Sequence, residues 1–537
     1  MPPFPFYVPR RKAGAYHTPP LLCVAALIPA LLVLVPISIT VFNACSGGWG
    51  MAVRLLWRPL VGTLLLNTLG LVVVVCGLCA VIGTLLAWLI ERTDLPGRAI
   101  WAPLAVVPLT IPAFVSSYSW LSISPAFAAF GGAVLVVTSS YYPFVYLPVA
   151  AALRGMDPAL EETARSLGLN IWQMFGRVIL PQLRPALLGG TLLVALNTLV
   201  EFGAFALLRY RTFTTTIYGT YRAGFFGAEP SLLGMVLLGL CIFCLVAEAL
   251  ARGRTRHYGR LARGVRRQAE RYRLGPWRFL ALLIPAGLGV VTIFVPLSTI
   301  AFWLTKPVDA ATTVAGASYL GLLTTSWSSI SLGLEAASLS LALALPLALL
   351  AVRYPGWLSF GLERCAYLAQ GLPGVVVALA LISVTVHHMF WLYQSRFLLI
   401  VAYTILFLPL ALVSVRAALM QAQIRLEEAA QSLGLGRFAT LWRVTLPLAA
   451  PGLGAAACMV FMAVVTELTT TLLMSPIGTW TLATELWADT STMAFAAAAP
   501  YAAVMVGISM AASWLLAGKL GRHGALSFET NAASERG

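Results

Sequence analysis

The sequence contains uncharged apolar runs that are long enough to cross a lipid bilayer. Val61–Ile90 and Ala99–Leu153 have no charged side chain. About 20 mostly apolar residues suffice for one membrane-spanning helix, so the second run has room for two. Of the 537 residues, 60% are hydrophobic and only 10% are charged, a balance typical of membrane proteins. These runs predict an all-α polytopic membrane protein.

About twelve spans are expected, six in each half of the chain. The first six are Leu21–Phe42, Val61–Ile90, Ala99–Leu121, Phe127–Leu153, Val178–Leu208 and Ser231–Leu250. The second six are Phe279–Leu304, Ile330–Val352, Cys365–Val386, Phe397–Leu419, Val444–Leu473 and Pro500–Leu520. The predicted organisation is an N-terminal half (1–250), a basic linker (251–277), a C-terminal half (278–520) and a polar tail (521–537).

The basic residues fix a predicted orientation. The net charge is +16, which on its own is compatible with nucleic-acid binding or with membrane topology. Most of the Lys and Arg residues fall in segments that alternate spans place on one side, including the Arg-rich linker. Because cytoplasmic loops are enriched in Lys and Arg, this distribution favours topology, with both termini cytoplasmic. The linker is interpreted as lying on the lipid surface, and nucleic-acid binding is not needed.

One stretch of the sequence occurs twice. EETARSLGLNIWQMFGRVILP at Glu161–Pro181 returns as EEAAQSLGLGRFATLWRVTLP at Glu427–Pro447. The same offset aligns Pro143 with Pro409 and Glu201 with Glu467. The chain is therefore an internal duplication. With an even number of spans in each half, the two repeats are parallel, and a pathway between them is expected.

Each repeated stretch begins with a short helix. Asp157 is a good N-cap, and Pro158 at the first helical position needs no amide partner. Gly168 permits the left-handed conformation that ends a helix. Such a helix presents Leu160, Ala164 and Leu167 as an apolar face, with Glu161, Glu162 and Arg165 at its rim. Leu426, Ala430 and Leu433 repeat that face.

The repeated stretch resembles the EAA signature of permease subunits of bacterial ABC importers. The matching residues are Glu161, Glu162, Ala164, Gly168 and Pro181, and again Glu427, Glu428, Ala430, Gly434 and Pro447. Thr163 stands where this signature usually has Ala. The resemblance implies a type I (MetI-like) permease of two parallel six-helix repeats, in which each signature forms a coupling helix that docks on an ATPase subunit. The alternative is two amphipathic helices that merely rest on the membrane surface.

The resemblance also implies partners. We find no GxxxxGK[ST] phosphate-binding loop; Gly518-Lys519 is followed by Leu520. The chain is therefore expected to be a transport subunit and not an enzyme, with ATP and Mg²⁺ held by two copies of a separate ATPase subunit. A binding protein would dock on the outer side of the bacterial inner membrane. No cofactor is expected on this chain.

Two carboxylates lie deep within otherwise apolar predicted spans, Glu201 and its duplicate Glu467. Charged side chains inside a membrane are costly, and they commonly mark ion pathways. Tyr210, Tyr218 and Tyr221 follow the first of them. Carboxylate and phenol oxygens suit a hard trivalent cation, so Glu201, Glu467, Tyr210 and Tyr218 are pathway candidates, and the two carboxylates are candidate metal ligands. The alternative is that each Glu is hydrogen-bonded in helix packing and never touches cargo.

The sequences around Glu201 and Glu467 resemble the corresponding segments of ferric-iron permeases with fused halves. The cargo implied is iron(III) delivered by a binding protein. Thiamine, a phosphonate such as 2-aminoethylphosphonate, and a polyamine are the alternatives for an importer of this type. A membrane-embedded enzyme lacks a catalytic cluster here, and a scaffold without transport does not explain paired intramembrane Glu residues.

Overall fold

The computed structural model describes residues 19–224, 227–252, 271–307 and 319–534. Every regular element in these ranges is a helix, as predicted. The residues group into two compact units, which are described separately below. The N-terminal Arg10–Lys12, most of the predicted basic linker and the last three residues of the tail lie outside the described residues.

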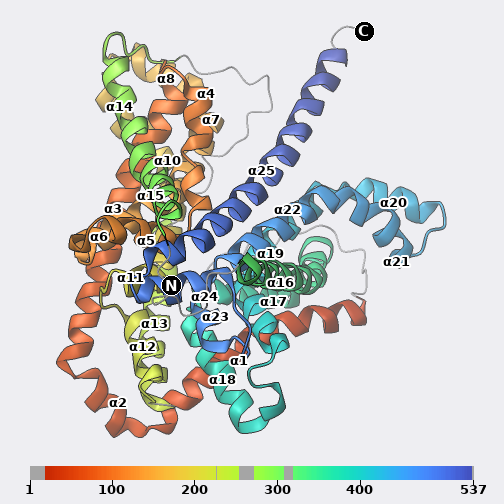
Figure 1. Ribbon diagram of the computed structural model, residues 1–537. Helices are drawn as coiled ribbons and strands as arrows, with labels where there is room; N and C mark the ends of the chain where they lie inside the picture. The colour runs from red at the N-terminus through yellow and green to blue at the C-terminus, as the bar shows by residue number, and fades with distance from the viewer. Residues whose placement is uncertain (1–18, 225–226, 253–270, 308–318, 535–537) are drawn as a thin grey trace. The chain divides into compact units, whose positions relative to one another are not determined.

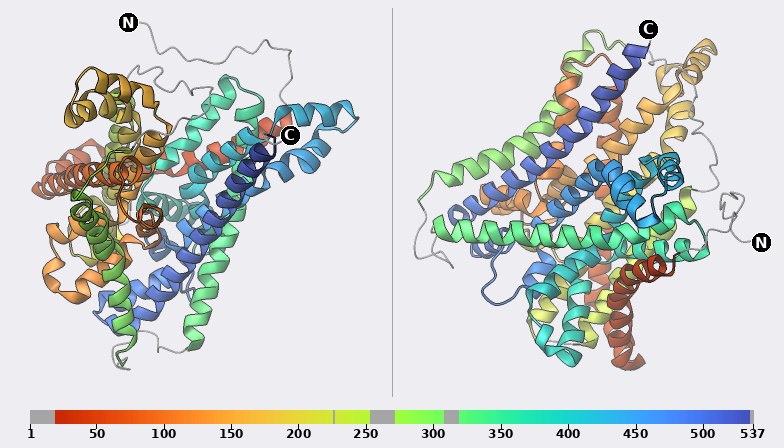
Figure 2. Two further views of the ribbon diagram at one scale, coloured as in Figure 1. Left: turned by 90° about the horizontal axis from the view of Figure 1, so that it is seen from above. Right: turned by 90° about the vertical axis from the view of Figure 1, so that its right-hand side faces the viewer.

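Unit 1 contains Met1–Ser46, Ser318–Glu485 and Gly507–Gly537. Its helices are α1 (Pro20–Ser46), α16 (Tyr319–Arg353), α17 (Trp357–Leu368), η5 (Ala369–Gly371), α18 (Gly374–His388), η6 (Phe390–Leu392), α19 (Arg396–Gln421), α20 (Ile424–Ser432), α21 (Arg437–Thr440), η7 (Leu441–Thr445), α22 (Leu446–Val465) and α23 (Thr469–Met474). Residues of α24 (Leu482–Ser491) and α25 (Phe495–Ser534) contribute to both units. Figure 1 shows α20 and α21 at one end of α22, and Figure 2 shows α16 as one unbroken helix of 35 residues.

Unit 2 contains Gly47–Ala317 and Leu486–Val506. Its helices are α2 (Gly48–Leu56), α3 (Pro59–Arg92), α4 (Arg98–Leu104), η1 (Val107–Thr110), α5 (Ala113–Ile123), η2 (Pro125–Phe127), α6 (Phe130–Tyr141), α7 (Pro143–Gly155), α8 (Pro158–Ser166), α9 (Ile171–Met174), η3 (Phe175–Ile179), α10 (Leu180–Val200), α11 (Gly203–Leu207), α12 (Phe213–Arg222), α13 (Ala228–Arg252), α14 (Trp277–Gly289), η4 (Val290–Phe294) and α15 (Val295–Leu304).

The units do not coincide with the sequence halves, because the first long helix of each half packs with the other half. The N-terminal helix α1 packs against α16, α17 and α18 in unit 1. Conversely, α14 contacts α3, and α15 contacts α5, in unit 2. The chain segments that join α1 to α2, and α15 to α16, therefore each lead from one compact unit into the other.

The predicted spans agree with the helices in position. Within the described residues, ten helices are long and apolar enough to cross a membrane, and two bent helix pairs raise the number to twelve. Every predicted span overlaps one of these twelve segments. The helix order of the first half, α3 to α10, returns in the second half as α16 to α22. The prediction of an all-α polytopic protein with a duplicated plan is confirmed.

Two of the predicted spans are not straight helices. The span predicted at Ala99–Leu121 is a pair of arms, Arg98–Thr110 and Ala113–Ile123, that meet at 89°. The span predicted at Cys365–Val386 is a pair, Trp357–Gly371 and Gly374–His388, that meet at 107°. Pro112 and Pro373 stand at the two bends. A proline disfavours helical backbone at the residue before it, and Ile111 and Leu372 are accordingly extended.

Small residues let three helices approach closely in each unit. A Cβ atom on Gly83 of α3 would lie 2.9 Å from Val145 Cβ, and one on Gly190 of α10 would lie 2.8 Å from Val145 Cα. Val145 belongs to α7, which packs against both helices. In unit 1 the corresponding positions of α16, α19 and α22 hold three buried alanines, Ala344, Ala411 and Ala456. At this three-helix contact, unit 2 combines two glycines with one larger valine, whereas unit 1 uses three alanines of equal size.

The different residues at this three-helix contact in the two units give a stability prediction. Gly83→Ala with Gly190→Ala overpacks the contact at Val145 and should destabilise unit 2 by about 1–3 kcal/mol. Adding Val145→Ala copies the alanine set of unit 1 and should recover part of the loss. Thermal unfolding in detergent measures all three variants. Gly62→Ala, where an added Cβ meets nothing within 4 Å, is the control. Equal melting temperatures for the double and triple variants would contradict this packing account.

Candidate functional site

The repeated segments form two short helices, α8 and α20, with the ends that the sequence predicts. Asp157 caps α8, since its Oδ1 accepts a hydrogen bond from the Ala159 amide at 3.0 Å. Gly168 has φ +78° and Gly434 has φ +91°, the left-handed conformation that ends a helix. The amide of the residue after each glycine donates to the carbonyl of Ala164 (3.2 Å) or Ala430 (3.1 Å), which completes a Schellman motif.

The exposed faces of α8 and α20 are alike but differ from the predicted face. Leu160 and Leu167 are 44% and 76% exposed, and their duplicates Leu426 and Leu433 are 45% and 86% exposed. Ala164 was predicted on the same face, but this is wrong because it is buried in the core of its own unit. A partner surface would therefore meet the leucines and the exposed Glu162 or Glu428.

The first glutamate of each repeat is an internal anchor. Glu161 was predicted as a rim charge, but it is 3% exposed. Its Oε1 lies 2.9 Å from Nη2 of Arg92, a buried side chain in the last turn of α3. The same nitrogen donates to the carbonyl of Leu153 in α7 at 2.9 Å. Arg92 thereby joins α3, α7 and α8 at one point.

Unit 1 contains the same kind of anchor at the duplicate glutamate, Glu427. Arg353, in the last turn of α16, lies 2.6 Å from Glu427 Oε1. Its Nη2 also donates to the carbonyls of Leu419 (3.4 Å) and Ala422 (3.2 Å). Leu419 is the duplicate of Leu153. Sequence reasoning missed both arginines, because the repeated stretch does not contain them; their position in the last turn of the span before the bent pair was the available signal.

A π-helical turn follows α8 and α20, after the short helices α9 and α21. In η3 the amide of Leu180 donates to Phe175 O, and in η7 the amide of Leu446 donates to Leu441 O, at duplicate positions. Pro181 and Pro447 come next, as the second residues of α10 and α22. Proline lacks an N–H, and its ring clashes with the carbonyl four residues earlier in an α-helix. The wider turn relieves that clash, and such turns are frequent at functional sites.

Glu201 and Glu467 lie at helix breaks, so the predicted continuous spans Val178–Leu208 and Val444–Leu473 are wrong. The long helix α10 ends at Val200, and α22 ends at Val465. Glu201 Oε1 accepts the Ala204 amide at 2.9 Å, while Glu467 Oε1 accepts the amide and hydroxyl of Thr470 at 3.0 and 3.1 Å. Each carboxylate thus caps the short helix, α11 or α23, that follows it.

In each half, the short helix at the end of the fifth predicted span packs against the second helix of the bent pair that forms the third. The short helix α11 packs on α5, and α23 packs on α18. A Cβ atom on Gly374, the first residue of α18, would lie 3.0 Å from Glu467 Oε1. Glycine at this position therefore lets the start of α18 approach the carboxylate. Discontinuous helices that meet at a charged group are typical of transporter binding sites.

The tyrosine that binds Glu201 is not one that the sequence indicated. Tyr141, at the end of α6, donates its hydroxyl to Glu201 Oε2 at 2.6 Å. Its duplicate position holds Phe407, whose ring has no hydroxyl. Tyr141 was missed because the repeat therefore gave no signal at this position.

The two tyrosines predicted for the pathway pack among aromatic rings. Tyr218 packs against Phe202, with ring centres 4.7 Å apart. Tyr210 packs beside Phe130 and Phe205, and its hydroxyl donates to Asn67 O at 3.4 Å. These contacts give both tyrosines a part in helix packing, and their role in a pathway stays a prediction.

A further carboxylate inside a span was also missed. Glu335 lies within α16, and its Oε1 accepts a hydrogen bond from Arg396 at 2.7 Å. Arg396 also donates to Ser331, one turn away on the same helix. The side chains of Arg396 and Glu335 are 42% and 44% exposed, and the ion pair between them gives the Glu335 carboxylate a partner.

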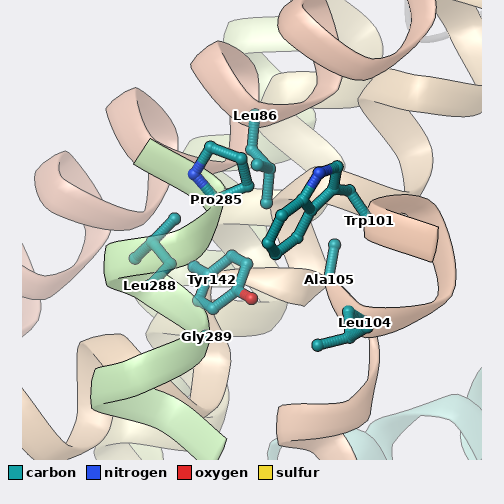
Figure 3. Close-up of a pocket in the computed structure, with 8 residues that line it drawn as sticks. All are labelled: Leu86, Trp101, Leu104, Ala105, Tyr142, Pro285, Leu288 and Gly289. Carbon is teal, nitrogen blue, oxygen red and sulfur yellow. The ribbon is translucent and has the colours of Figure 1, made fainter. Parts of the chain in front are cut away.

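Two small pockets differ in character. One, lined by Leu86, Trp101, Leu104, Ala105, Tyr142, Pro285, Leu288 and Gly289, is apolar apart from the hydroxyl and indole groups (Figure 3). The other lies beside Glu467 in unit 1 and is lined by Ser329, Leu332, Tyr403, Val464, Val465, Glu467 and Thr481. Hydroxyl groups and one carboxylate therefore converge at the break after α22.

In the described part of the chain, no group of three or more His, Cys, Asp and Glu side chains is arranged to hold a metal ion. Glu201 and Glu467 stay predicted pathway residues and candidate metal ligands.

Comparisons with known proteins match the whole duplicated region. The family model for the binding-protein-dependent transport system inner membrane component matches twice, at residues 80–253 and 340–517. The Fe(3+)-transport system permease protein FbpB 2 of Haemophilus influenzae is 35% identical over 484 residues, which cover 89% of this chain and 94% of that protein.

Shorter relatives match part of the chain. The Escherichia coli sulfate transport system permease protein CysT is 29% identical over 193 residues, 33% of this chain and 70% of that protein. The Escherichia coli molybdenum transport system permease protein ModB is 30% identical over 192 residues, 32% of this chain and 79% of that protein.

The buried ion pair gives a prediction for α8. Glu161→Gln leaves Arg92 buried without a counter-charge, which typically costs about 3–5 kcal/mol. We expect faster amide hydrogen exchange in α8 and in the last turn of α3, measured by mass spectrometry. The control is Glu162→Gln, since Glu162 is exposed and its loss should leave exchange unchanged. Identical exchange in the two variants would show that Arg92 does not anchor this helix.

Proposed function

The chain belongs to the family of binding-protein-dependent transport system inner membrane components, and we propose that it imports ferric iron, driven by ATP hydrolysis on a separate subunit. It is a permease of an ABC importer and spans the membrane many times. In the proposed complex, two ATPase subunits bind on the cytoplasmic side, and a binding protein delivers iron on the outer side. Both termini are cytoplasmic in this arrangement.

The observation that carries the ATPase proposal is the pair of matched helices α8 and α20. Each exposes two leucines and a glutamate, ends at a left-handed glycine and is tied to its own unit by an arginine, Arg92 or Arg353, that is 3% or 12% exposed. An exposed apolar ridge on a firmly anchored helix suits docking into a groove of a partner. Because there are two such helices in one chain, two ATPase subunits are accommodated.

The anchors indicate how movement would pass from α8 and α20 to the membrane. A push on α8 acts on Glu161, and Arg92 transmits it to the ends of α3 and α7. A second route follows the chain itself: after α8 come the π turn η3 and then α10, whose last residue, Val200, directly precedes Glu201. ATP-driven closure would thus shift the helices that end at the proposed cargo path, as in rigid-body gating of transporters.

Iron(III) is favoured over other cargo by two observations. The relative that matches nearly its whole length and both halves is named as an Fe(3+)-transport permease, whereas the sulfate and molybdenum permeases match about a third of this chain. The side chains at the helix breaks are carboxylates and hydroxyls, Glu201 with Tyr141 and Glu467 with Thr470. Such oxygen ligands suit a hard cation, and the negative charge of the two carboxylates would repel an oxyanion.

The proposal predicts selective uptake. The permease, its ATPase and its binding protein are reconstituted in liposomes, and entry of radiolabelled iron, thiamine and aminoethylphosphonate is measured with and without ATP. We expect ATP-dependent entry of iron alone. Entry of thiamine or aminoethylphosphonate without iron would refute the cargo assignment and leave the family assignment intact.

In the same assay, Glu201→Gln combined with Glu467→Gln should lower iron flux at least tenfold. Glutamine keeps a carbonyl oxygen that can still accept the amides of Ala204 and Thr470, so helix capping survives while the negative charge is lost. Glu229→Gln, which removes the carboxylate of an exposed ion pair with Arg58, is the control. Normal iron flux in the double variant would assign both glutamates to helix capping.

A second variant tests the coupling helices. Gly168→Val with Gly434→Val places β-branched residues at positive φ, which costs at least about 1–2 kcal/mol at each site. The helix ends should shift, and ATP should be hydrolysed without proportionate iron uptake. Gly436→Val is the matched control, because Gly436 has φ −63° and an added Cβ meets nothing within 4 Å. Unchanged uptake per ATP in the double variant would argue against coupling through α8 and α20.

A further inference from the structure

The segment that leads from the first half into the second is pinned next to α8. Tyr272 lies just before α14, and its backbone forms an isolated parallel bridge with Thr93 at the end of α3. Its amide donates to Arg92 O at 2.9 Å, and its carbonyl accepts the Asp94 amide at 3.2 Å. Asp94 in turn accepts the Leu274 amide at 2.8 Å. These bonds fix the chain direction at this point.

The side chain of Tyr272 fills the space between α3 and α8. Its ring stacks on Trp88 of α3, with centres 5.4 Å apart and planes at 24°. The guanidinium of Arg165 in α8 lies 4.6 Å from the ring centre in a cation–π contact. The hydroxyl donates to Glu161 Oε2 at 3.1 Å. Burial raises the pKa of Tyr272, so the phenol stays protonated and remains a donor.

Glu161 therefore has a separate partner for each carboxylate oxygen. Arg92 lies beside Oε1 and Tyr272 binds Oε2. Only Glu161 and Ala164 of α8 are buried. The position of the helix thus depends strongly on what holds Glu161.

Two residues that surround Tyr272 differ from their duplicates in the second half. When α3 and α16 are aligned on their anchor arginines, the position of Trp88 holds Leu349, and the repeat offset places Gln431 at the position of Arg165. Glu427 is held by Arg353 and by Thr445, whose hydroxyl donates to Glu427 Oε1 at 3.0 Å. Thr445 comes from the same repeat as Glu427, whereas Tyr272 lies in the inter-half segment. Trp88 and Arg165 contact Tyr272 of the connecting segment, whereas their duplicate positions hold the aliphatic Leu349 and the uncharged Gln431.

We propose that Tyr272 is a positioning residue for the first coupling helix, through which the segment joining the two halves holds α8 against α3. The proposal rests on the proposed function of α8 as an ATPase contact. Among the described residues, Glu427 of α20 is held by Arg353 and Thr445 of its own half, while Glu161 of α8 is also held by Tyr272 of the connecting segment.

The contact itself is tested on the full-length permease alone in nanodiscs, without partners. Tyr272→Phe keeps the ring between Trp88 and Arg165 but removes the hydroxyl. Loss of a hydrogen bond to a charged group should speed amide exchange in α8 by about tenfold, with α20 unchanged as an internal control. Tyr272→Ala should have a larger effect. Tyr354→Phe, at the corresponding end of α16, is the matched control. Equal exchange of α8 in wild type and both Tyr272 variants, or equal changes in α8 and α20, would overturn the proposal.

A second readout separates positioning from simple stability. In the reconstituted transporter, Tyr272→Phe should lower iron carried per ATP hydrolysed by about two- to fivefold, whereas the melting temperature and the amount of folded permease stay unchanged. A normal ratio of transport to hydrolysis would refute the positioning role. If the wild-type complex carries no iron, the proposed function fails, and the exchange experiment still decides whether Tyr272 holds α8.

Discussion

A lipid bilayer offers no hydrogen-bond partner to a broken helix, and the structure depends on how its breaks are satisfied. At the ends of α10 and α22 the chain supplies its own partners. Glu201 and Glu467 cap the next short helix, while Thr214 and Thr471 donate to the carbonyls of these two glutamates at 2.7 and 2.6 Å. Each carboxylate therefore has a structural role as a cap, and its proposed part in a cargo pathway comes in addition to that role.

Near the opposite ends of α10 and α22, single side chains likewise bind several groups at once. Arg92 and Arg353 each pair with a glutamate and donate to at least one carbonyl at a helix end, so that one guanidinium joins three helices. Guanidinium groups suit this because they have several donors in a fixed plane. The short helices α8 and α20 are consequently attached to the ends of the long helices beside them. The π turns before Pro181 and Pro447 separate this attachment from the long helices that reach Glu201 and Glu467.

Periodicity and repeats predicted much, because they depend on local physics. Each predicted span overlaps one of the candidate spans among the described residues, although some of them continue past a helix break, and Asp157 and Gly168 correctly predicted the ends of α8. The bends at Pro112 and Pro373 were predictable in principle from proline sterics, yet they were read as straight spans because the apolar runs continue through them. Tyr141 and Arg92 were not predictable from the repeat, since their contacts join residues far apart in sequence and, for Tyr141, the duplicate position differs.

The sequence by itself determined that the chain is a duplicated helical membrane protein with two matching short helices, α8 and α20, because hydrophobic length, capping residues and repeat spacing act locally. Only the tertiary structure decided which side of α8 faces inward, that Glu161 is an anchor and not a surface charge, and that the first helix of each half packs with the other half. Among the described residues, Tyr272 contacts Glu161 and Arg165 of α8, whereas Glu427 of α20 is held by Arg353 and Thr445. Only the folded chain shows these contacts, because they join residues that the repeat pattern does not link.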